Sequence, residues 1–161
     1  MMRNNLVRSV GIPLVWFGLA LVASAGTSEP PPQGAAATGV LTIKVVGARS
    51  AKGKIRVALF QGPEGFPENG SAAHRREQTD IESQTMSAEV VFRDVPQGVY
   101  AVSVLHDENM NGKLDKGLFG IPQEGYGASN NPGKKMRAPT FDEAKFSLSS
   151  PEQSIEIKLI Y

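Results

Sequence analysis

Apolar and polar residues alternate with a period of two along most of the chain after residue 38. This pattern predicts β-strands that are buried on one face. The clearest alternating runs are 41–45, 54–59, 90–92, 100–105, 146–148 and 155–161. No window keeps a helical period for more than two turns, and the best is a single turn over 71–77 capped by Ser71.

Clusters of glycine, proline and small polar residues separate these runs, as expected for turns. The turn residues of 47–53 predict an antiparallel hairpin between the first two runs. About seven short strands connected in this way favour an all-β fold, an antiparallel sandwich of the immunoglobulin-like kind. One stretch from 106 to 145 has little apolar periodicity and is predicted to be a long loop.

The segment Asp94–Tyr100 supports the sandwich. Proline and glycine form a tight turn here, and Tyr100 then opens a strand from which its hydroxyl can reach back to the upstream backbone. Immunoglobulin-like sandwiches contain a tyrosine corner of this type. An ordinary hairpin turn followed by a core tyrosine is the alternative, and it belongs to the same fold.

Residues 1–25 have the order of a secretory signal peptide. Arg3 and Arg8 precede an apolar core of 13 residues, Val10–Val22, and a small-residue site at Ala23–Ala25 follows. The alternative is a retained membrane anchor, against which Pro13 and the short core both argue, because a span needs roughly 20 residues. The chain has no cysteine, which excludes a lipid-anchored lipoprotein and disulfide bonds.

Residues 26–38 are rich in proline and alanine and predict an extended tether, which leaves one β-sandwich domain at 39–161. Cleavage after Ala25 would remove two arginines and leave 15 basic against 16 acidic side chains. A near-neutral exported domain is not expected to bind nucleic acid. We expect a periplasmic or secreted protein with no stable membrane insertion after signal cleavage.

The long loop opens with a pattern typical of calcium loops. Oxygen-bearing side chains alternate, a glycine follows at Gly112, and the spacing matches positions 1, 3, 5, 6 and 9 of such a loop, with a backbone carbonyl at position 7. Calcium prefers six to eight hard oxygen ligands, which alternate residues of a curling loop can present. The predicted ligands are Asp107, Asn109, Asn111, the Lys113 carbonyl and Asp115.

The calcium pattern is incomplete, because position 12 is Leu118 and not a bidentate glutamate. Glu124 is the nearest downstream acid that could supply a further ligand. With only two loop carboxylates, we expect a dissociation constant of about 10⁻⁴ to 10⁻³ M. The alternative is a metal-free turn, because Asp and Asn side chains also form tight turns by bonding to the backbone.

Other polar or glycine-rich features have simpler explanations. The three glycines of 120–127 predict a loop that needs positive φ, with Ile121 and Tyr126 packed on the sandwich, although such a loop could also approach a ligand closely. His106 is in phase with the core face of its strand and is predicted to be a hydrogen-bonded structural residue, whereas His74 is predicted to be exposed. The basic residues Lys134, Lys135 and Arg137 are predicted to be solvated, although they could meet acidic polymers at the envelope.

With these residues in view, the chain resembles the bacterial family called domain of unknown function 2141. The resemblance rests on segments in the family's order that cover nearly all of the domain: 58–60, 64–67, 96–101, 106–115, 120–127, 129–131 and 139–144. Ala128 departs from the larger apolar residue that the family tends to carry there. The resemblance implies an exported β-sandwich without a known activity, and the strand leading into the Asp/Asn/Gly loop is similar to transthyretin-like modules, which act as stalks and adhesion units.

The sequence therefore predicts an exported, non-enzymatic binding or structural module, with calcium as the only expected cofactor and an unknown partner in the envelope or outside the cell. The alternative is an enzyme that acts on an envelope polymer through Glu124, Asp115 or His106. No motif brings a nucleophile, a base and an orienting group together, so we do not expect an enzyme.

Overall fold

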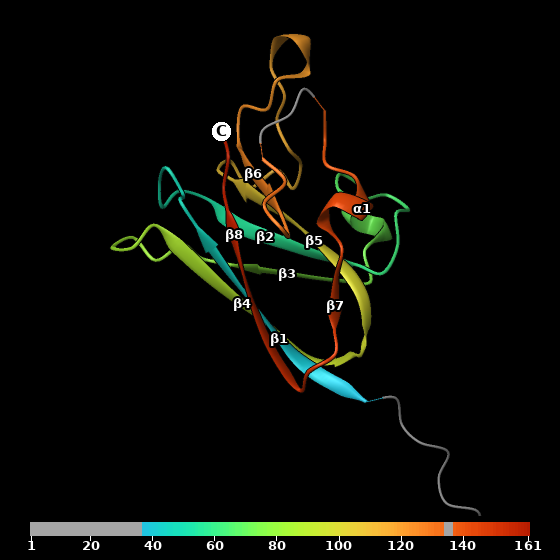
Figure 1. The fold of residues 1–161 in the computed structure, drawn as a ribbon. Coiled ribbons are helices and arrows are strands. Elements are labelled where there is room, and N and C mark those ends of the chain that lie inside the picture. The colour runs from blue at the N-terminus through green and yellow to red at the C-terminus, as the bar shows by residue number, and fades with distance from the viewer. Residues whose placement is uncertain (1–36, 134–136) are drawn as a thin grey trace, which may run out of the picture. The chain divides into compact units, whose positions relative to one another are not determined.

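Figure 1 shows the computed structural model, which describes residues 37–133 and 137–161. The signal peptide expected at 1–25 and residues 26–36 of the expected tether lie outside the described residues. Within the described ranges, no helix is both long and apolar enough to cross a bilayer.

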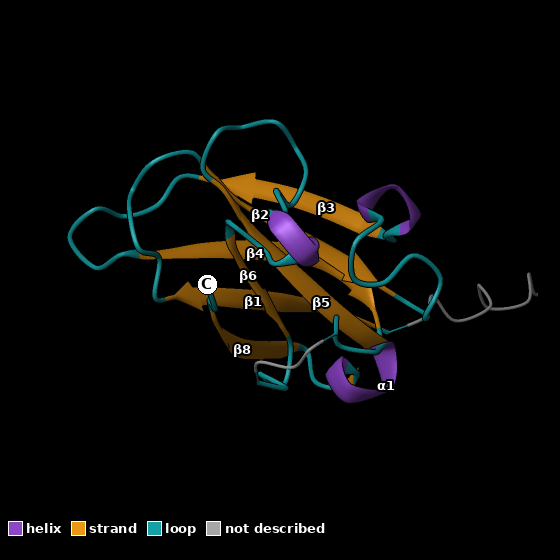
Figure 2. Cartoon of the chain, turned by 90° about the horizontal axis from the view of Figure 1, so that it is seen from above, coloured by secondary structure: helices purple, strands orange, loops and turns teal. Residues whose placement is uncertain are grey.

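Eight strands form two sheets in the described part of the chain (Figures 1 and 2). They are β1 (Thr38–Val46), β2 (Lys54–Phe60), β3 (Arg75–Thr79), β4 (Ser87–Pro96), β5 (Gly98–Asp107), β6 (Gly125–Ala128), β7 (Phe146–Leu148) and β8 (Glu152–Lys158). The helical elements are short: α1 (Phe141–Ala144) and the 3-10 turns η1 (Gly70–Ala72) and η2 (Leu118–Gly120). The predicted all-β sandwich is confirmed.

One sheet has the order β4-β1-β8, and the other has the order β3-β2-β5-β6, with β7 paired to the start of β5. All pairs are antiparallel except β1–β8, which is parallel. The isolated bridge between Tyr126 and Ile160 ties β6 to the chain end that follows β8. The two sheets are therefore connected along this side.

The core lies between the two sheets and consists of the apolar residues of each alternating run, as the period predicts. The three-stranded sheet contributes Leu41, Ile43, Val45, Val90, Phe92 and Ile157, and the larger sheet contributes Ile55, Val57, Leu59, Tyr100, Val102 and Val104. A separate small cluster forms on the outer face of the larger sheet, where α1 packs on β5 and β6 through Ala101, Ala128 and Ala144. The rest of that outer face is not covered by α1.

The predicted hairpin between the first two runs is wrong. β1 pairs with β4 and β8, whereas β2 pairs with β3 and β5, so residues 47–53 cross from one sheet to the other. Gly47 and Gly53 take φ values of 81° and 72° at the two ends of this crossing. Alternation indicates which face of a strand is buried. Because both sheets of a sandwich bury an apolar face, alternation does not indicate to which sheet a strand belongs.

The helical turn predicted over 71–77 is also wrong. Asn69, not Ser71, caps the short η1 turn, and Arg75–Thr79 forms β3. Residues 75–79 show no apolar alternation, because β3 is an edge strand whose residues are mostly charged and exposed. Charged residues at a sheet edge discourage pairing with another chain.

The tyrosine corner is present. Tyr100 is fully buried, and its hydroxyl donates to the Pro96 carbonyl at 2.8 Å and accepts from Gln61 Nε2 at 3.1 Å. This bond closes the passage from β4 in one sheet to β5 in the other.

Replacing Tyr100 by phenylalanine should lower the free energy of unfolding by about 1–3 kcal/mol, because the Pro96 carbonyl and the Gln61 amide would lose their partner. Denaturant unfolding measures the change. The matched control is Tyr126→Phe, because the Tyr126 hydroxyl has no hydrogen bond recorded among the described residues, and it should change stability by no more than about 0.5 kcal/mol. Equal effects at the two positions would contradict the role of the corner.

Candidate functional site

Asp107 ends β5, opens the long loop and is completely buried. Its Oδ1 accepts from the Asn111 N–H at 3.0 Å, and its Oδ2 accepts from the Gly112 N–H at 2.8 Å. Arg56 on the neighbouring strand β2 donates its Nε–H to Oδ2 at 2.5 Å. Three donors thus offset the cost of burying this carboxylate, and two of them fix the first turn of the loop.

The other predicted ligands lie in the same turn. Asn109 and Asn111 accept the N–H groups of Asn111 and Lys113 at 3.0 and 2.8 Å. The same two side chains donate to the Asp115 carboxylate at 2.6 and 2.9 Å. The structure therefore brings Asp107, Asn109, Asn111 and Asp115 together, with the hydrogen bonds typical of Asx turns.

Glu124, the further ligand that the calcium pattern suggests, contacts the backbone of the same loop. Its side chain is only 4% exposed, and its two oxygens accept the N–H groups of Glu108 and Asp115 at 2.9 and 3.1 Å. It joins the start of the loop to its middle. Among residues 37–133 and 137–161, no group of three or more acidic, histidine or cysteine side chains is placed to hold a metal ion.

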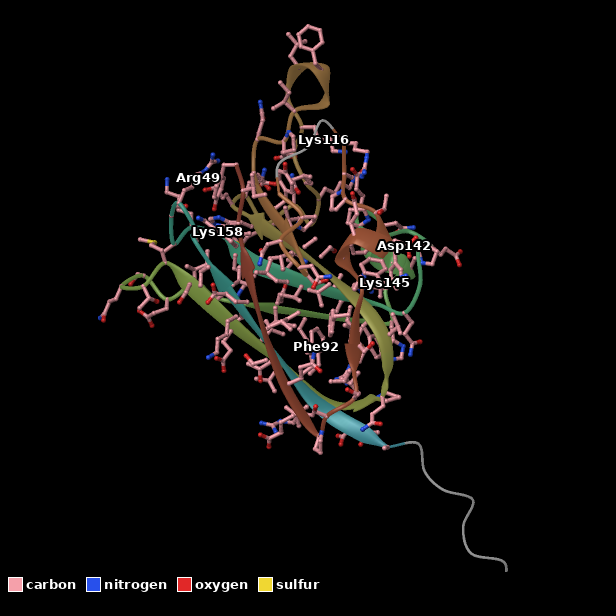
Figure 3. All side chains as sticks on the ribbon, in the orientation of Figure 1. Arg49, Phe92, Lys116, Asp142, Lys145 and Lys158 are labelled. Atoms are coloured by element: carbon pink, nitrogen blue, oxygen red, sulfur yellow. The ribbon has the colours of Figure 1, made fainter. Side chains whose placement is uncertain are left out.

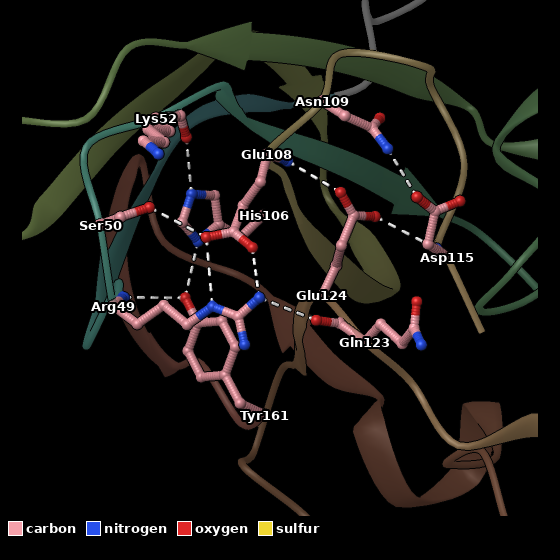
Figure 4. Close-up of polar contacts among 10 residues, drawn as sticks. All are labelled: Arg49, Ser50, Lys52, His106, Glu108, Asn109, Asp115, Gln123, Glu124 and Tyr161. Atoms are coloured by element: carbon pink, nitrogen blue, oxygen red, sulfur yellow. Dashed lines mark hydrogen bonds and ion pairs between the residues drawn. The ribbon is translucent and has the colours of Figure 1, made fainter. Parts of the chain in front are cut away.

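His106 is buried beside the loop and is a structural residue, as predicted (Figure 4). Its Nε2 lies 2.8 Å from the Lys52 carbonyl and its Nδ1 lies 2.6 Å from the Tyr161 hydroxyl. Because a carbonyl only accepts, Nε2 carries the hydrogen, and in the neutral ring Nδ1 accepts from the tyrosine. Burial raises the pKa of Tyr161. His74 is exposed, as predicted.

An ion pair between Arg49 and Glu108 ties the 47–53 crossing to the long loop (Figure 4). Arg49 also donates to the Gln123 carbonyl at 2.8 Å, and the Ser50 hydroxyl donates to Glu108 at 2.9 Å. The hydrogen bond from Arg49 lowers the pKa of Glu108 against the opposing effect of burial, and Glu108 raises the pKa of Arg49. These residues border an open depression of about 570 Å³.

A larger groove of about 920 Å³ lies on the outer face of the five-stranded sheet. Its floor includes residues from two cross-strand rows, Arg76–Ala58–Ser103 and Gln78–Arg56–Leu105–Tyr126. The side chains of Ala58 and Ser103 are small, so they leave space above the sheet in this part of the groove. The walls are parts of the long loop, the 67–70 connection and residues 137–139.

The groove has both apolar and cationic lining. Its apolar residues include Leu105, Leu114, Phe119, Ile121, Pro122 and Tyr126. Five cationic and two acidic side chains line it, and three of the cations have acidic partners: Arg56 with Asp107, Lys116 with Glu68, and Arg137 with Glu143. Arg76 and Lys113 have no ion pair within the described residues, and Glu77 is the acidic neighbour of Arg76 in the groove.

A family model described as "Uncharacterized protein conserved in bacteria (DUF2141)" matches residues 43–156. The chain is a member of this family. The matched segment contains the long loop and all the residues that line the groove. Searches of curated proteins and of solved structures gave no match.

The glycine-rich segment of this DUF2141 member differs in part from the prediction. Of its three glycines only Gly120 has a positive φ, of 74°. Gly125 and Gly127 belong to β6, and a Cβ at Gly127 would lie 2.8 Å from Ile157 Cγ2, so close packing against the other sheet requires glycine there. Ile121 is 61% exposed and does not pack on the sandwich, although it lines the groove together with Tyr126.

Sequence reasoning missed the groove because its residues come from six separate segments. Arg56 and Leu105 were visible only as the polar or outward positions of predicted strands. Of the predicted basic cluster, Lys134 and Lys135 lie outside the described residues, and Arg137 pairs with Glu143. No local motif indicates that these segments meet.

Proposed function

We propose that this protein is an exported, non-enzymatic binding module and that its ligand occupies the groove on the outer face of the five-stranded sheet. The groove itself carries the proposal, because its volume falls within the range of about 300–1,000 Å³ that is usual for small-ligand sites. Its mixture of apolar lining and a few polar groups is also usual for such sites. Export rests on the signal-like pattern of residues 1–25.

The lining favours a ligand with an anionic group and an apolar part. Arg76 and Lys113 offer cationic groups that are not held in ion pairs with described residues. Leu105 and Tyr126 supply an apolar strip on the floor between the walls. An apolar body on this strip would gain from leaving water, and its anionic group would meet the cations.

The environments of the polar residues support a role without catalysis. His106 and Glu124 are buried and use their ring nitrogens and carboxylate oxygens in bonds that hold the loop. Asp115 receives two amide groups and lies in the turn. The groups on which the enzymatic alternative would depend thus serve to build the loop.

An anionic aromatic probe, anilinonaphthalene sulfonate, should bind the folded protein at one site and gain fluorescence. Ala58→Trp, which fills the floor of the groove, should abolish binding, and Arg76→Glu should weaken it roughly tenfold or more through charge reversal. Tryptophan is well accepted in a strand, so the first variant should stay folded.

The matched control for charge is Arg93→Glu, which makes the same change at an exposed position of β4 in the other sheet. It should bind the probe as the unmodified protein does. Unchanged binding by Ala58→Trp, with unfolding midpoints alike, would contradict the groove as the ligand site.

We also propose weak calcium binding by the 107–115 turn. The convergence of Asp107, Asn109, Asn111 and Asp115 supports it, since these side chains lie together at the spacing of a calcium loop. The Arg56 partner of Asp107 and the engagement of Glu124 with backbone N–H groups both reduce the negative charge available to a cation. We therefore expect a dissociation constant of about 10⁻³ M.

Thermal unfolding in calcium, magnesium and chelator tests this proposal. About 5 mM calcium should stabilise the fold by about 1 kcal/mol and raise the midpoint by a few degrees, and magnesium should have less effect. Asp115→Asn should remove the calcium effect, whereas Asp142→Asn, the same change at an exposed position in α1, should not. Identical midpoints in the three conditions would rule out the calcium site.

A further inference from the structure

The tip of the long loop is a narrow finger formed by residues 115–123. Backbone bonds pair its two sides: Gln123 N–H donates to the Asp115 carbonyl and Gly117 N–H donates to the Ile121 carbonyl, both at 2.8 Å. The Gly120 N–H closes the turn on the Gly117 carbonyl at 3.1 Å. Figure 3 shows this turn projecting beyond both sheets, with Lys116 near its base.

The finger exposes its apolar side chains. Phe119 is 90% exposed, Leu118 is 78% exposed and Ile121 is 61% exposed. These are three of the six large apolar residues that are exposed in the described part of the chain, and they lie within four consecutive positions. A single exposed apolar residue is ordinary on a protein surface, whereas a contiguous group indicates an interaction site.

The backbone makes phenylalanine an unfavourable choice for this turn. Phe119 has φ 60° and ψ 20°, a left-handed conformation that glycine and asparagine adopt much more readily. Neither turn stability nor core packing explains a bulky apolar residue at this position. Its presence in a strained, exposed place is consistent with a role in binding.

The charge around the finger favours a negatively charged surface. Residues 116–122 include one lysine and no acidic residue. Lys116 pairs with Glu68, and Lys113 in the same loop has no ion pair among the described residues. The acidic group at the base, Asp115, already receives two amide groups.

We propose that the finger docks on anionic membrane surfaces, with Phe119, Leu118 and Ile121 entering the interface and the lysines meeting lipid headgroups. Shallow insertion of apolar side chains combined with attraction to anionic lipids is an established mode of peripheral binding. A few side chains on a narrow tip offer too little area for a stable contact between proteins, which usually buries about 800 Å² on each partner. Phe119, Ile121 and Lys113 also line the walls of the groove, but the docking does not use the residues of the groove floor.

Co-sedimentation of the purified protein with vesicles tests the proposal. The protein should bind vesicles of phosphatidylglycerol and phosphatidylethanolamine more tightly than vesicles of phosphatidylcholine. Phe119→Asn should reduce the partition coefficient roughly tenfold or more because it removes the largest inserted side chain. The same variant should keep or raise the unfolding midpoint, because asparagine suits the left-handed turn.

Two further variants separate the possible explanations. Val99→Asn removes another exposed apolar side chain, at the start of β5, and should bind vesicles normally. Ala58→Trp blocks the groove and should also bind vesicles normally, so this proposal and the groove proposal can fail independently. The proposal is overturned if the unmodified protein binds no vesicles, or if Phe119→Asn binds vesicles as well as the unmodified protein does. It is also overturned if Ala58→Trp loses vesicle binding. Finally, it is overturned if the effect of Phe119→Asn is instead to abolish self-association of the protein.

Discussion

The buried carboxylate of Asp107 is the constraint on which the long loop depends. It sits at the end of a core strand, where solvent cannot stabilise its charge, and it draws in Arg56 and the N–H groups of Asn111 and Gly112. Removing such a group from its partners would leave buried donors unsatisfied, which is costly. Glu124 is a second buried carboxylate of this kind, later in the loop, and both its oxygens accept backbone N–H groups of the loop. The loop is thus held by carboxylates at two places without a regular element of more than a few residues.

This anchoring determines what the outer face of the five-stranded sheet can do. α1 covers one part of that face, and Ser129 holds it there by donating to the Ala144 carbonyl at 2.6 Å and accepting from the Val102 N–H at 2.9 Å. The loop rises along another part and becomes a wall of the groove. The sandwich core is therefore closed, and the functional surfaces that we propose are built on its outside by the loop.

Much of the fold could be predicted from the sequence, because a period of two marks β1, β2, β4, β5, β7 and β8, although it marks neither the edge strand β3 nor the short β6. The tyrosine corner was predictable as well, since Tyr100 follows a Pro-Gly turn at the start of its strand. The pairing of β1 was not predictable, because alternation does not distinguish the two sheets of a sandwich. α1 carried a usable signal, since Thr140 and Glu143 have the spacing of a capping box and form one.

The candidate site was predictable only in its local part. The Asx turn follows directly from the spacing of Asp107, Asn109 and Asn111, but its pairing with Arg56 depends on the β2–β5 register. The groove depends on the same register and on where the loop returns. The exposure of Phe119 also could not be inferred, because an apolar residue in a loop usually packs somewhere.

Amide hydrogen exchange in the unmodified protein and in Asp107→Ala tests the central claim most directly. If the carboxylate anchors the loop, exchange should accelerate strongly at residues 108–123 in the variant, while the paired amides of β2 and β5 stay protected. Unchanged protection of the loop would contradict the account, because the loop would then be held by other contacts. Loss of protection throughout both sheets would also contradict it, since Asp107 would then support the whole fold and not the loop.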